Sequence, residues 1–266
     1  TKNKWDQNIL KLHGNKAFLI GQGYSDRGQF PFIDQMDLKS KKTKRLYESS
    51  YTDKKENLME AIDMDKGEIL VRIESPTTYP NYYIRDIDRK NDLKQITFFE
   101  NPFEGLQNVH KELITYKRDD GLELSATMYL PPNYDKSKKE KLPMLLWAYP
   151  REFKDKASAA QNTQNPNEFI YPSYGSFVYW VMKGYVVLDD AAFPIVGEGD
   201  EQPNDTFIKQ LVANGKAAID AVDELGYIDR NRVAVGGHSY GAFMTANLLA
   251  HSDLFAAGIA RSGAYN

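Results

Sequence analysis

The segment G-H-S-Y-G, Gly237 to Gly241, has the residue types and the spacing of a serine nucleophile. In the G-x-S-x-G pattern, a sharp turn between a strand and a helix strains the serine backbone and lifts its Oγ off the sheet edge. Side chains two positions before and after the serine would collide in this turn, so both positions are glycine. An apolar run, Arg232–Gly236, precedes the motif, and small residues follow it. We therefore predict that Ser239 is a nucleophile, against the alternative of a glycine-rich turn with an inert serine.

Acyl transfer through a serine also needs hydrogen-bond donors aimed at the developing oxyanion. The backbone N–H of Tyr240, the residue after the serine, is one such donor by geometry. The second is expected from the loop after the predicted strand Met144–Tyr149, where the hydroxyl of Tyr149 is a candidate. The alternative for Tyr149 is an aromatic side chain packed at the end of a strand.

A serine nucleophile needs a base, and the four histidines of the chain are poor candidates for it. His13 lies in a repeat region and His110 in a linker. His238 is adjacent to the serine, and neighbouring side chains on such a turn diverge, whereas His251 ends the next helix and suits a C-terminal cap. In this kind of site the Asp and the His follow the serine in the chain. We therefore expect both beyond residue 266, so that these residues alone are inactive or are one fragment of an enzyme.

Composition limits the function classes. The chain has 266 residues, 41% of them hydrophobic and 12% aromatic, which is enough for one large or two ordinary packed domains. The net charge of −3 gives no indication of a nucleic-acid partner. The sequence has no cysteine, so disulfides and thiolate metal sites are excluded. No apolar run reaches the roughly 18–20 residues of a membrane span, and the first residues lack the apolar centre of a signal peptide.

The first part of the chain repeats itself after about 50 residues. Gly14–Ile20 resembles Asp65–Val71, and Pro31–Asp37 resembles Tyr82–Asp88. Each copy is predicted to form a strand, a loop, a strand, a polar turn and a further strand. Repeats of this length built from short strands are typical of β-propeller blades. We predict that residues 1–107 are the C-terminal blades of a partial β-propeller, against the alternative of two unrelated hairpins.

The rest of the chain has the pattern of an α/β domain. Two strands, Ile114–Lys117 and Leu124–Leu130, are expected to pair around a turn. Apolar strands then alternate with helices, which predicts a covered and largely parallel sheet. The strands are expected at Met144–Tyr149, Gly184–Asp189, Arg232–Gly236 and from Gly258, and the helices at Phe207–Leu225 and Ala242–His251. With the serine motif, this predicts that residues 108–266 are the N-terminal part of an α/β-hydrolase domain, truncated after the helix that follows the serine and the next strand.

Several motifs together resemble the prolyl oligopeptidase family of serine peptidases, and in particular its glutamyl endopeptidase branch. They are G-G-H-S-Y-G-A-F-M-T-A-N-L-L-A-H, then G-I-A-R-S-G-A-Y-N, with support from Phe193–Glu201, Asn204–Phe207 and Glu74–Tyr82. The resemblance implies a propeller that gates a hydrolase domain and a cofactor-free acyl-enzyme mechanism on peptide substrates. It assigns Ser239 as nucleophile, with Tyr240 and Tyr149 as the oxyanion donors. For bacterial members it also implies export to the periplasm or the outside.

Preference for a glutamyl residue at P1, the substrate residue before the cleaved bond, requires a cation near the serine. Arg151 and Arg261 are the candidates, because guanidinium groups recognise carboxylates through paired hydrogen bonds. The alternative for each is a solvated or structural arginine. The acidic run Glu198–Glu201 has no histidine ligands nearby and is not predicted to bind metal. It is a candidate for binding a substrate amine, which would favour an aminopeptidase-like activity.

Three other functions remain open at this stage. One is a dipeptidyl or acylaminoacyl exopeptidase of the same family. Another is an esterase, because the serine motif does not distinguish amide from ester substrates. The third is a non-catalytic propeller binding module on an inactive hydrolase scaffold, which labelling of Ser239 would separate from the enzymes.

Overall fold

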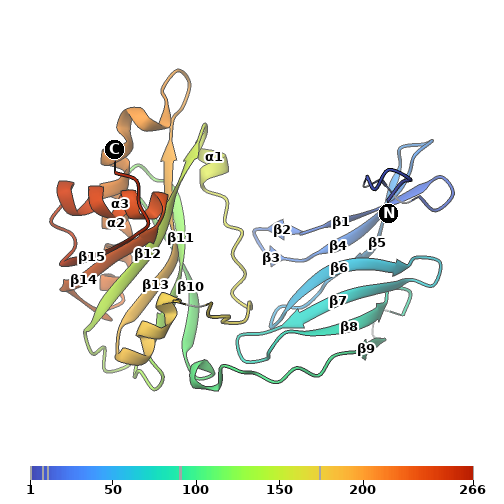
Figure 1. Cartoon of the computed structure of the whole chain (residues 1–266), viewed down its shortest axis with the longest axis horizontal. Coiled ribbons are helices and arrows are strands. Elements are labelled where there is room, and N and C mark those ends of the chain that lie inside the picture. Colours follow the sequence, from blue (N-terminus) through green and yellow to red (C-terminus); the bar gives the residue numbers. More distant parts are fainter. Residues whose placement is uncertain (1, 8, 11, 90–91, 174, 266) are drawn as a thin grey trace. The chain divides into compact units, whose positions relative to one another are not determined.

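The computed structural model describes residues 2–7, 9–10, 12–89, 92–173 and 175–265. The chain divides into two compact units (Figure 1). The first contains residues 1–102 and 167–170, and the second contains residues 103–166 and 171–266. The division therefore falls earlier than the expected boundary after residue 107. The short 3₁₀ helix η1 (Glu104–Leu106) and the buried Val109 already belong to the second unit.

The first unit is built from antiparallel sheets. One contains, in spatial order, β1 (Lys16–Gly21), β4 (Phe32–Asp37) and β5 (Thr43–Glu48). Another contains β6 (Lys55–Asp63), β7 (Glu68–Glu74), β8 (Asn81–Asp86) and β9 (Leu93–Gln95). A small hairpin pairs β2 (Tyr24–Ser25) with β3 (Gly28–Gln29). The two sequence repeats correspond to β1-β4-β5 and to β7-β8-β9, so each copy forms the strand order that its pattern predicts.

A buried polar cluster lies inside the first unit. The Nε of Arg85 donates to the carboxylate of Glu56 at 2.7 Å, and the Tyr47 hydroxyl donates to the same carboxylate at 2.7 Å. The chain also returns to this unit at residues 167–170, where the Phe169 N–H donates to the buried Glu74 at 3.1 Å. Sequence periodicity gave no sign of that return, because it depends on single contacts between residues far apart in the chain.

The second unit contains a six-stranded sheet in the order β10-β11-β13-β12-β14-β15. Its strands are β10 (His110–Lys117), β11 (Glu123–Leu130), β12 (Leu142–Phe153), β13 (Val186–Val196), β14 (Ile228–His238) and β15 (Ala257–Arg261). β11 pairs antiparallel with β10 and with β13, and the remaining pairs are parallel. The predicted hairpin and the predicted largely parallel sheet are both present.

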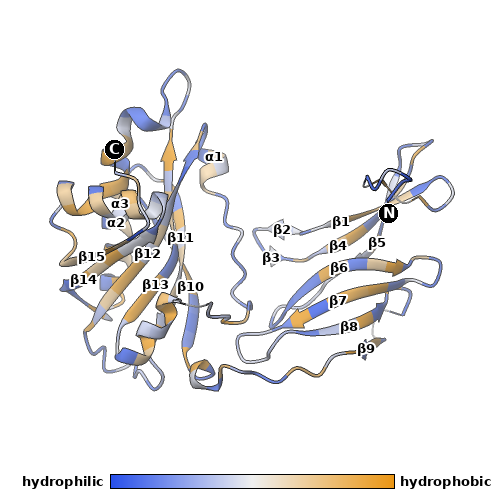
Figure 2. Ribbon diagram, in the orientation of Figure 1, coloured by the Kyte–Doolittle hydropathy of each residue, from blue (hydrophilic) through white to orange (hydrophobic). Residues whose placement is uncertain are grey.

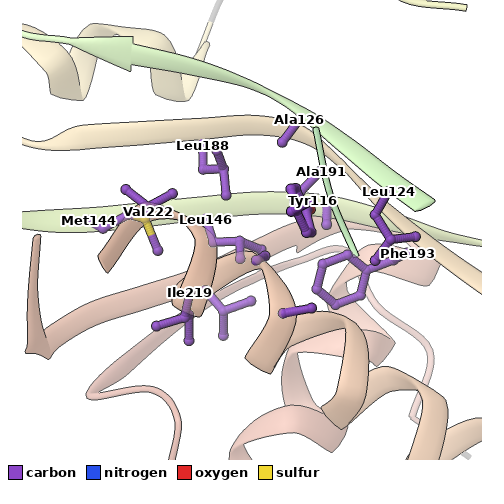
Figure 3. Close-up of a cluster of buried hydrophobic side chains, with 14 of the residues drawn as sticks. Tyr116, Leu124, Ala126, Met144, Leu146, Leu188, Ala191, Phe193, Ile219 and Val222 are labelled. Atoms are coloured by element: carbon purple, nitrogen blue, oxygen red, sulfur yellow. The ribbon is translucent and has the colours of Figure 1, made fainter. Parts of the chain in front are cut away.

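The helices of this unit are α1 (Lys156–Ala159), α2 (Phe207–Glu224) and α3 (Tyr240–His251), with 3₁₀ helices η2 (Phe177–Lys183) and η3 (Pro203–Thr206). Hydrophobic residues concentrate in the strands and polar residues in the connecting loops (Figure 2). The apolar face of α2, through Ile219 and Val222, packs against strand residues such as Met144, Leu146 and Leu188 (Figure 3). Along the described residues, no helix combines the length and the apolar character that crossing a membrane requires.

β12 continues further than the sequence predicts. It was expected to end at Tyr149 and to be followed by a loop, but it pairs with β13 through Phe153 opposite Val196. Pro150 is tolerated inside the strand because β14 pairs with β12 only as far as Trp147, so the missing N–H is not needed on that side. Tyr149 and Arg151 therefore lie on a strand, which fixes their side chains more firmly than a loop would.

Candidate active site

The turn between β14 and α3 places Ser239 in a strained backbone conformation, with φ 55° and ψ −114°. A positive φ is uncommon for a residue other than glycine, and such strain is concentrated at functional sites. Hydrogen bonds on both sides hold the conformation. The Ser239 N–H donates to the carbonyl oxygen of Arg261 at 2.9 Å, and the Ser239 carbonyl accepts from Ala242 at 2.9 Å and from Phe243 at 3.2 Å.

Both glycines of the motif are required by close approach of backbone segments. A methyl group at Gly237 would lie 2.4 Å from the carbonyl carbon of Gly241. A methyl group at Gly241 would lie 2.6 Å from the carbonyl oxygen of Ala148 in β12. The residues two positions either side of Ser239 therefore let the turn pack against itself and against the neighbouring strand.

The two tyrosines predicted as oxyanion donors lie beside each other. The rings of Tyr149 and Tyr240 meet edge to face, with centroids 6.0 Å apart. The Tyr240 ring is also stacked on Phe207 at 5.7 Å and on Phe243 at 5.9 Å. The Tyr240 hydroxyl donates to a carboxylate oxygen of Glu152 at 2.9 Å. Burial, and then this hydrogen bond, raise the pKa of Tyr240 to about 12, so its hydroxyl stays protonated at neutral pH.

Tyr149 and Arg151 line one hollow of the second unit. Alternate residues of a strand point to the same face, so these two side chains lie side by side along β12. The loop residue Gln164 and Asp190 of β13 contribute to the same hollow. Within the described part of the chain, the Arg151 guanidinium forms no ion pair or hydrogen bond with another side chain.

Arg261 has a different place. It ends β15, opposite His238 of β14, and its carbonyl oxygen accepts the Ser239 N–H. Its side chain is exposed and is not part of the hollow that contains Tyr149 and Arg151. The two candidate arginines thus lie in different places: Arg151 lines the hollow with Tyr149, and Arg261 contacts the serine turn through its carbonyl oxygen.

The histidines have contacts of their own. His13, in the first unit, lies 3.5 Å from Asp65 and packs edge-on against Phe18. His110 begins β10, rather than lying in a linker, and contacts Glu112 at 3.0 Å. His238 precedes the serine, and His251 is the last residue of α3. Among the described residues, none forms a hydrogen bond with the Ser239 Oγ.

The acidic run Glu198–Glu201 lies away from the hollow of Tyr149. Glu198 and Glu201 line a separate hollow, together with Lys156, Lys209 and the buried Arg118. Across the described residues, no group of three His, Cys, Asp or Glu side chains is placed to hold a metal ion. The structure therefore does not bring this run together with the tyrosines.

Two features near the hollow were missed by sequence reasoning. One is Glu152, the hydrogen-bond partner of Tyr240. The other is an irregularity in β13, where Asp189 and Asp190 face Trp147 of β12 and Asp190 adopts φ 46°. Burial, and then the neighbouring Asp190, raise the pKa of Asp189 to about 7. Adjacent aspartates inside an otherwise apolar strand were the available signal for this feature.

Comparison with known proteins agrees with the serine motif. A family model described as "Prolyl oligopeptidase family" matches residues 208–266. The chain is also 44% identical over 266 residues to "Probable glutamyl endopeptidase, chloroplastic" of Arabidopsis thaliana, an alignment that covers 95% of this chain and 27% of that protein. This chain belongs to the prolyl oligopeptidase family. The predicted family is thereby confirmed.

Within the prolyl oligopeptidase family, a protein of the same name from Oryza sativa subsp. japonica is 42% identical over 268 residues, covering 97% of this chain and 28% of that protein. The chain thus spans little more than a quarter of the length of these relatives. Solved structures share the fold. One is dipeptidyl peptidase 4 of Porphyromonas gingivalis, with TM-score 0.61, 20% identity, and coverage of 98% of this chain and 35% of that one. Another is oligopeptidase B of Leishmania major, with TM-score 0.60, 13% identity, and coverage of 95% and 34%.

Proposed function

We propose that this chain carries the nucleophile of a serine peptidase that cleaves oligopeptides through an acyl-enzyme on Ser239. The observation that carries the proposal is the strained Ser239 turn with the Tyr149 ring against the next residue, Tyr240. Family membership and the peptidase names of the relatives add support. The relatives' names do not set the substrate of this chain, so peptides as substrates are part of the proposal.

In the proposed mechanism the Ser239 Oγ attacks the scissile carbonyl carbon as a base removes its proton. The negative charge that develops on the carbonyl oxygen receives hydrogen bonds from the backbone N–H of Tyr240 and the hydroxyl of Tyr149. The amine then leaves with a proton from the conjugate acid, and water hydrolyses the acyl-enzyme by the reverse sequence of proton transfers. Among the described residues the Ser239 Oγ has no hydrogen-bond partner, and the proposal assigns the base and its carboxylate partner to none of them.

We propose that the first unit, residues 1–102 with 167–170, consists of propeller blades and that the second unit, residues 103–166 and 171–266, is part of the α/β-hydrolase domain. The antiparallel sheets β1-β4-β5 and β6-β7-β8-β9, which carry the repeat, support the first assignment. The mixed sheet and the position of Ser239 between β14 and α3 support the second. The remaining hydrolase segment would be a partner of this part within one protein.

We further propose a preference for glutamate at P1, with Arg151 as the side chain that binds the substrate carboxylate. Arg151 shares a hollow with Tyr149 and has no protein anion as a partner among the described residues. Arg261 is the weaker candidate, because its side chain lies outside that hollow. An exopeptidase that binds a substrate amine through Glu198–Glu201 is less well supported, since these residues line a separate hollow that also holds lysines.

The decisive test is labelling of the full-length polypeptide with a fluorophosphonate probe, followed by peptide mapping. We expect the label on Ser239. Ser239→Ala should abolish labelling and should lower peptide hydrolysis by roughly 10⁴-fold or more. Thr245→Ser, which changes a hydroxyl residue inside α3, is the control for general disturbance. Turnover that survives Ser239→Ala would sink the nucleophile assignment, and an unlabelled but folded protein would favour the non-catalytic binding module.

A further inference from the structure

Tyr240 is engaged at its side chain as well as at its backbone. It is the first residue of α3, directly after the nucleophile, and its hydroxyl donates to Glu152 at 2.9 Å. Glu152 lies on β12, the strand that also carries Tyr149. This hydrogen bond therefore ties the helix that follows Ser239 to the strand that supplies the second proposed oxyanion donor.

The Tyr149 ring packs against Tyr240, the residue that this hydrogen bond holds. Tyr149 is 47% exposed, and among the described residues its hydroxyl has no hydrogen-bond partner. The aromatic contact that steadies its ring is the edge-to-face packing on Tyr240, with centroids 6.0 Å apart. Tyr240 itself is held by stacking on Phe207 and Phe243 and by the bond to Glu152. A misplacement of about 1 Å in a reacting group can cost on the order of 100-fold in rate.

The negative charge of Glu152 does not explain why a carboxylate lies next to the proposed oxyanion site. A carboxylate near an oxyanion site opposes the negative charge that develops there. Glu152 also forms no ion pair with a described cation. Its contribution is therefore expected from its acceptor oxygen, which an amide oxygen would also supply.

We propose that Glu152 is a positioning residue for the oxyanion site, holding Tyr240 so that the Tyr240 ring fixes the hydroxyl of Tyr149. The inference rests on the proposed peptidase function and goes beyond it, because it assigns a role to a residue other than the proposed nucleophile and oxyanion donors. If the proposal is right, removing the Glu152 carboxylate slows the reaction at Ser239 only because the Tyr149 hydroxyl is misplaced.

The test measures inactivation of the full-length polypeptide by a fluorophosphonate probe, separating the maximal rate kinact from the probe affinity KI. We expect Glu152→Ala to lower kinact roughly 10-fold with KI unchanged. Tyr240→Phe should lower kinact to a similar extent, because it removes the hydroxyl that donates to Glu152. Glu152→Gln should restore most of kinact, because its amide oxygen accepts the same hydrogen bond. Glu123→Ala, which removes an exposed carboxylate from β11, is the matched control.

The most discriminating measurement compares Glu152→Ala in the unsubstituted protein with Glu152→Ala in a Tyr149→Phe variant, which lacks the hydroxyl to be positioned. There Glu152→Ala should cause no further loss of kinact, because coupled residues are not additive. An equal loss in both backgrounds overturns the proposal, as does Glu152→Gln being as slow as Glu152→Ala, or an unchanged kinact in Glu152→Ala. If the unsubstituted protein is folded and is not labelled at all, the peptidase function fails instead. The unfolding midpoint of each variant identifies loss of fold.

Discussion

The backbone N–H of Ser239 donates to the carbonyl oxygen of Arg261 at 2.9 Å. The bond joins the strained turn to the end of β15, the strand that pairs with β14 through His238 opposite Arg261. The conformation of Ser239 is thus held by a strand that follows it in the chain. Because the acceptor is a main-chain oxygen, any residue at position 261 can provide it, which leaves the Arg261 side chain without a role in holding the serine.

Arg151, unlike Arg261, has its side chain in the hollow with Tyr149, and this difference leads to a prediction for the two arginines. Arg151→Gln should lower kcat/KM for a peptide with Glu at P1 by roughly 10- to 100-fold, since a hydrogen bond to a charged group contributes about 1.5–3 kcal/mol. The same change should have little effect on the matched peptide with Gln at P1. Arg261→Gln is the control and should leave the Glu-to-Gln ratio unchanged. If Arg261→Gln alone lowers that ratio, the proposed carboxylate binder is the wrong arginine.

The glycines of the serine motif give a second prediction. Gly241→Ala would place a methyl group 2.6 Å from the Ala148 carbonyl oxygen. We expect a loss of about 1–3 kcal/mol in the free energy of unfolding, by overpacking, together with slower fluorophosphonate labelling of Ser239. Gly105→Ala is the matched control, because nothing lies within 4 Å of its added methyl group. Denaturant unfolding checks the stability, and equal stability of the two variants would contradict the close-packing argument.

The partly buried Asp189 gives a prediction on pH. Burial, and then Asp190, raise its pKa from the usual 3.8 to about 7, while Lys111 opposes the shift. The folded state therefore holds this proton more tightly than the unfolded state does, so the contribution of Asp189 to stability is greatest below pH 3.8. That contribution falls as the pH rises from 3.8 to about 7, by at most about 4 kcal/mol.

Asp189→Asn should remove this fall. Unfolding free energies measured between pH 4 and pH 8 should decline less steeply for the variant than for the unsubstituted protein. Asp200→Asn controls for the change in net charge, because Asp200 is exposed and forms no ion pair with another described residue. Parallel pH curves for Asp189→Asn and the unsubstituted protein would show that Asp189 ionises normally in the folded state.

The buried pair of the first unit gives the last prediction. Arg85→Met would leave the Glu56 carboxylate buried without its cation and should cost about 3–5 kcal/mol in the free energy of unfolding. The double variant Glu56→Leu with Arg85→Met should cost less than Arg85→Met alone, because it leaves no unpaired charge. Urea unfolding of both variants provides the measurement. A double variant that is less stable than Arg85→Met alone would contradict the explanation that the unpaired Glu56 charge causes the loss.

Much of the fold follows from local patterns. The serine motif, the strand before it and the helix after it were predicted because each depends on a few consecutive residues and on the steric freedom of Gly237 and Gly241. The predicted helix Phe207–Leu225 ends within one residue of the observed α2, because its apolar face repeats with helical spacing. The strands of the two repeats were also predicted, because their alternating apolar residues and polar turns are local patterns.

The sequence by itself determined the tight turn at Ser239 in an α/β sheet and a repeated strand unit, since short-range sterics and periodicity encode both. Only the tertiary structure decided that β12 runs on to Phe153, that residues 167–170 return to the first unit, and that Glu152 meets Tyr240. Those contacts join residues far apart in the chain through single hydrogen bonds and ring contacts, which leave no periodic trace in the sequence. The separation of Arg151 from Arg261 has the same origin, because it depends on which strands are neighbours.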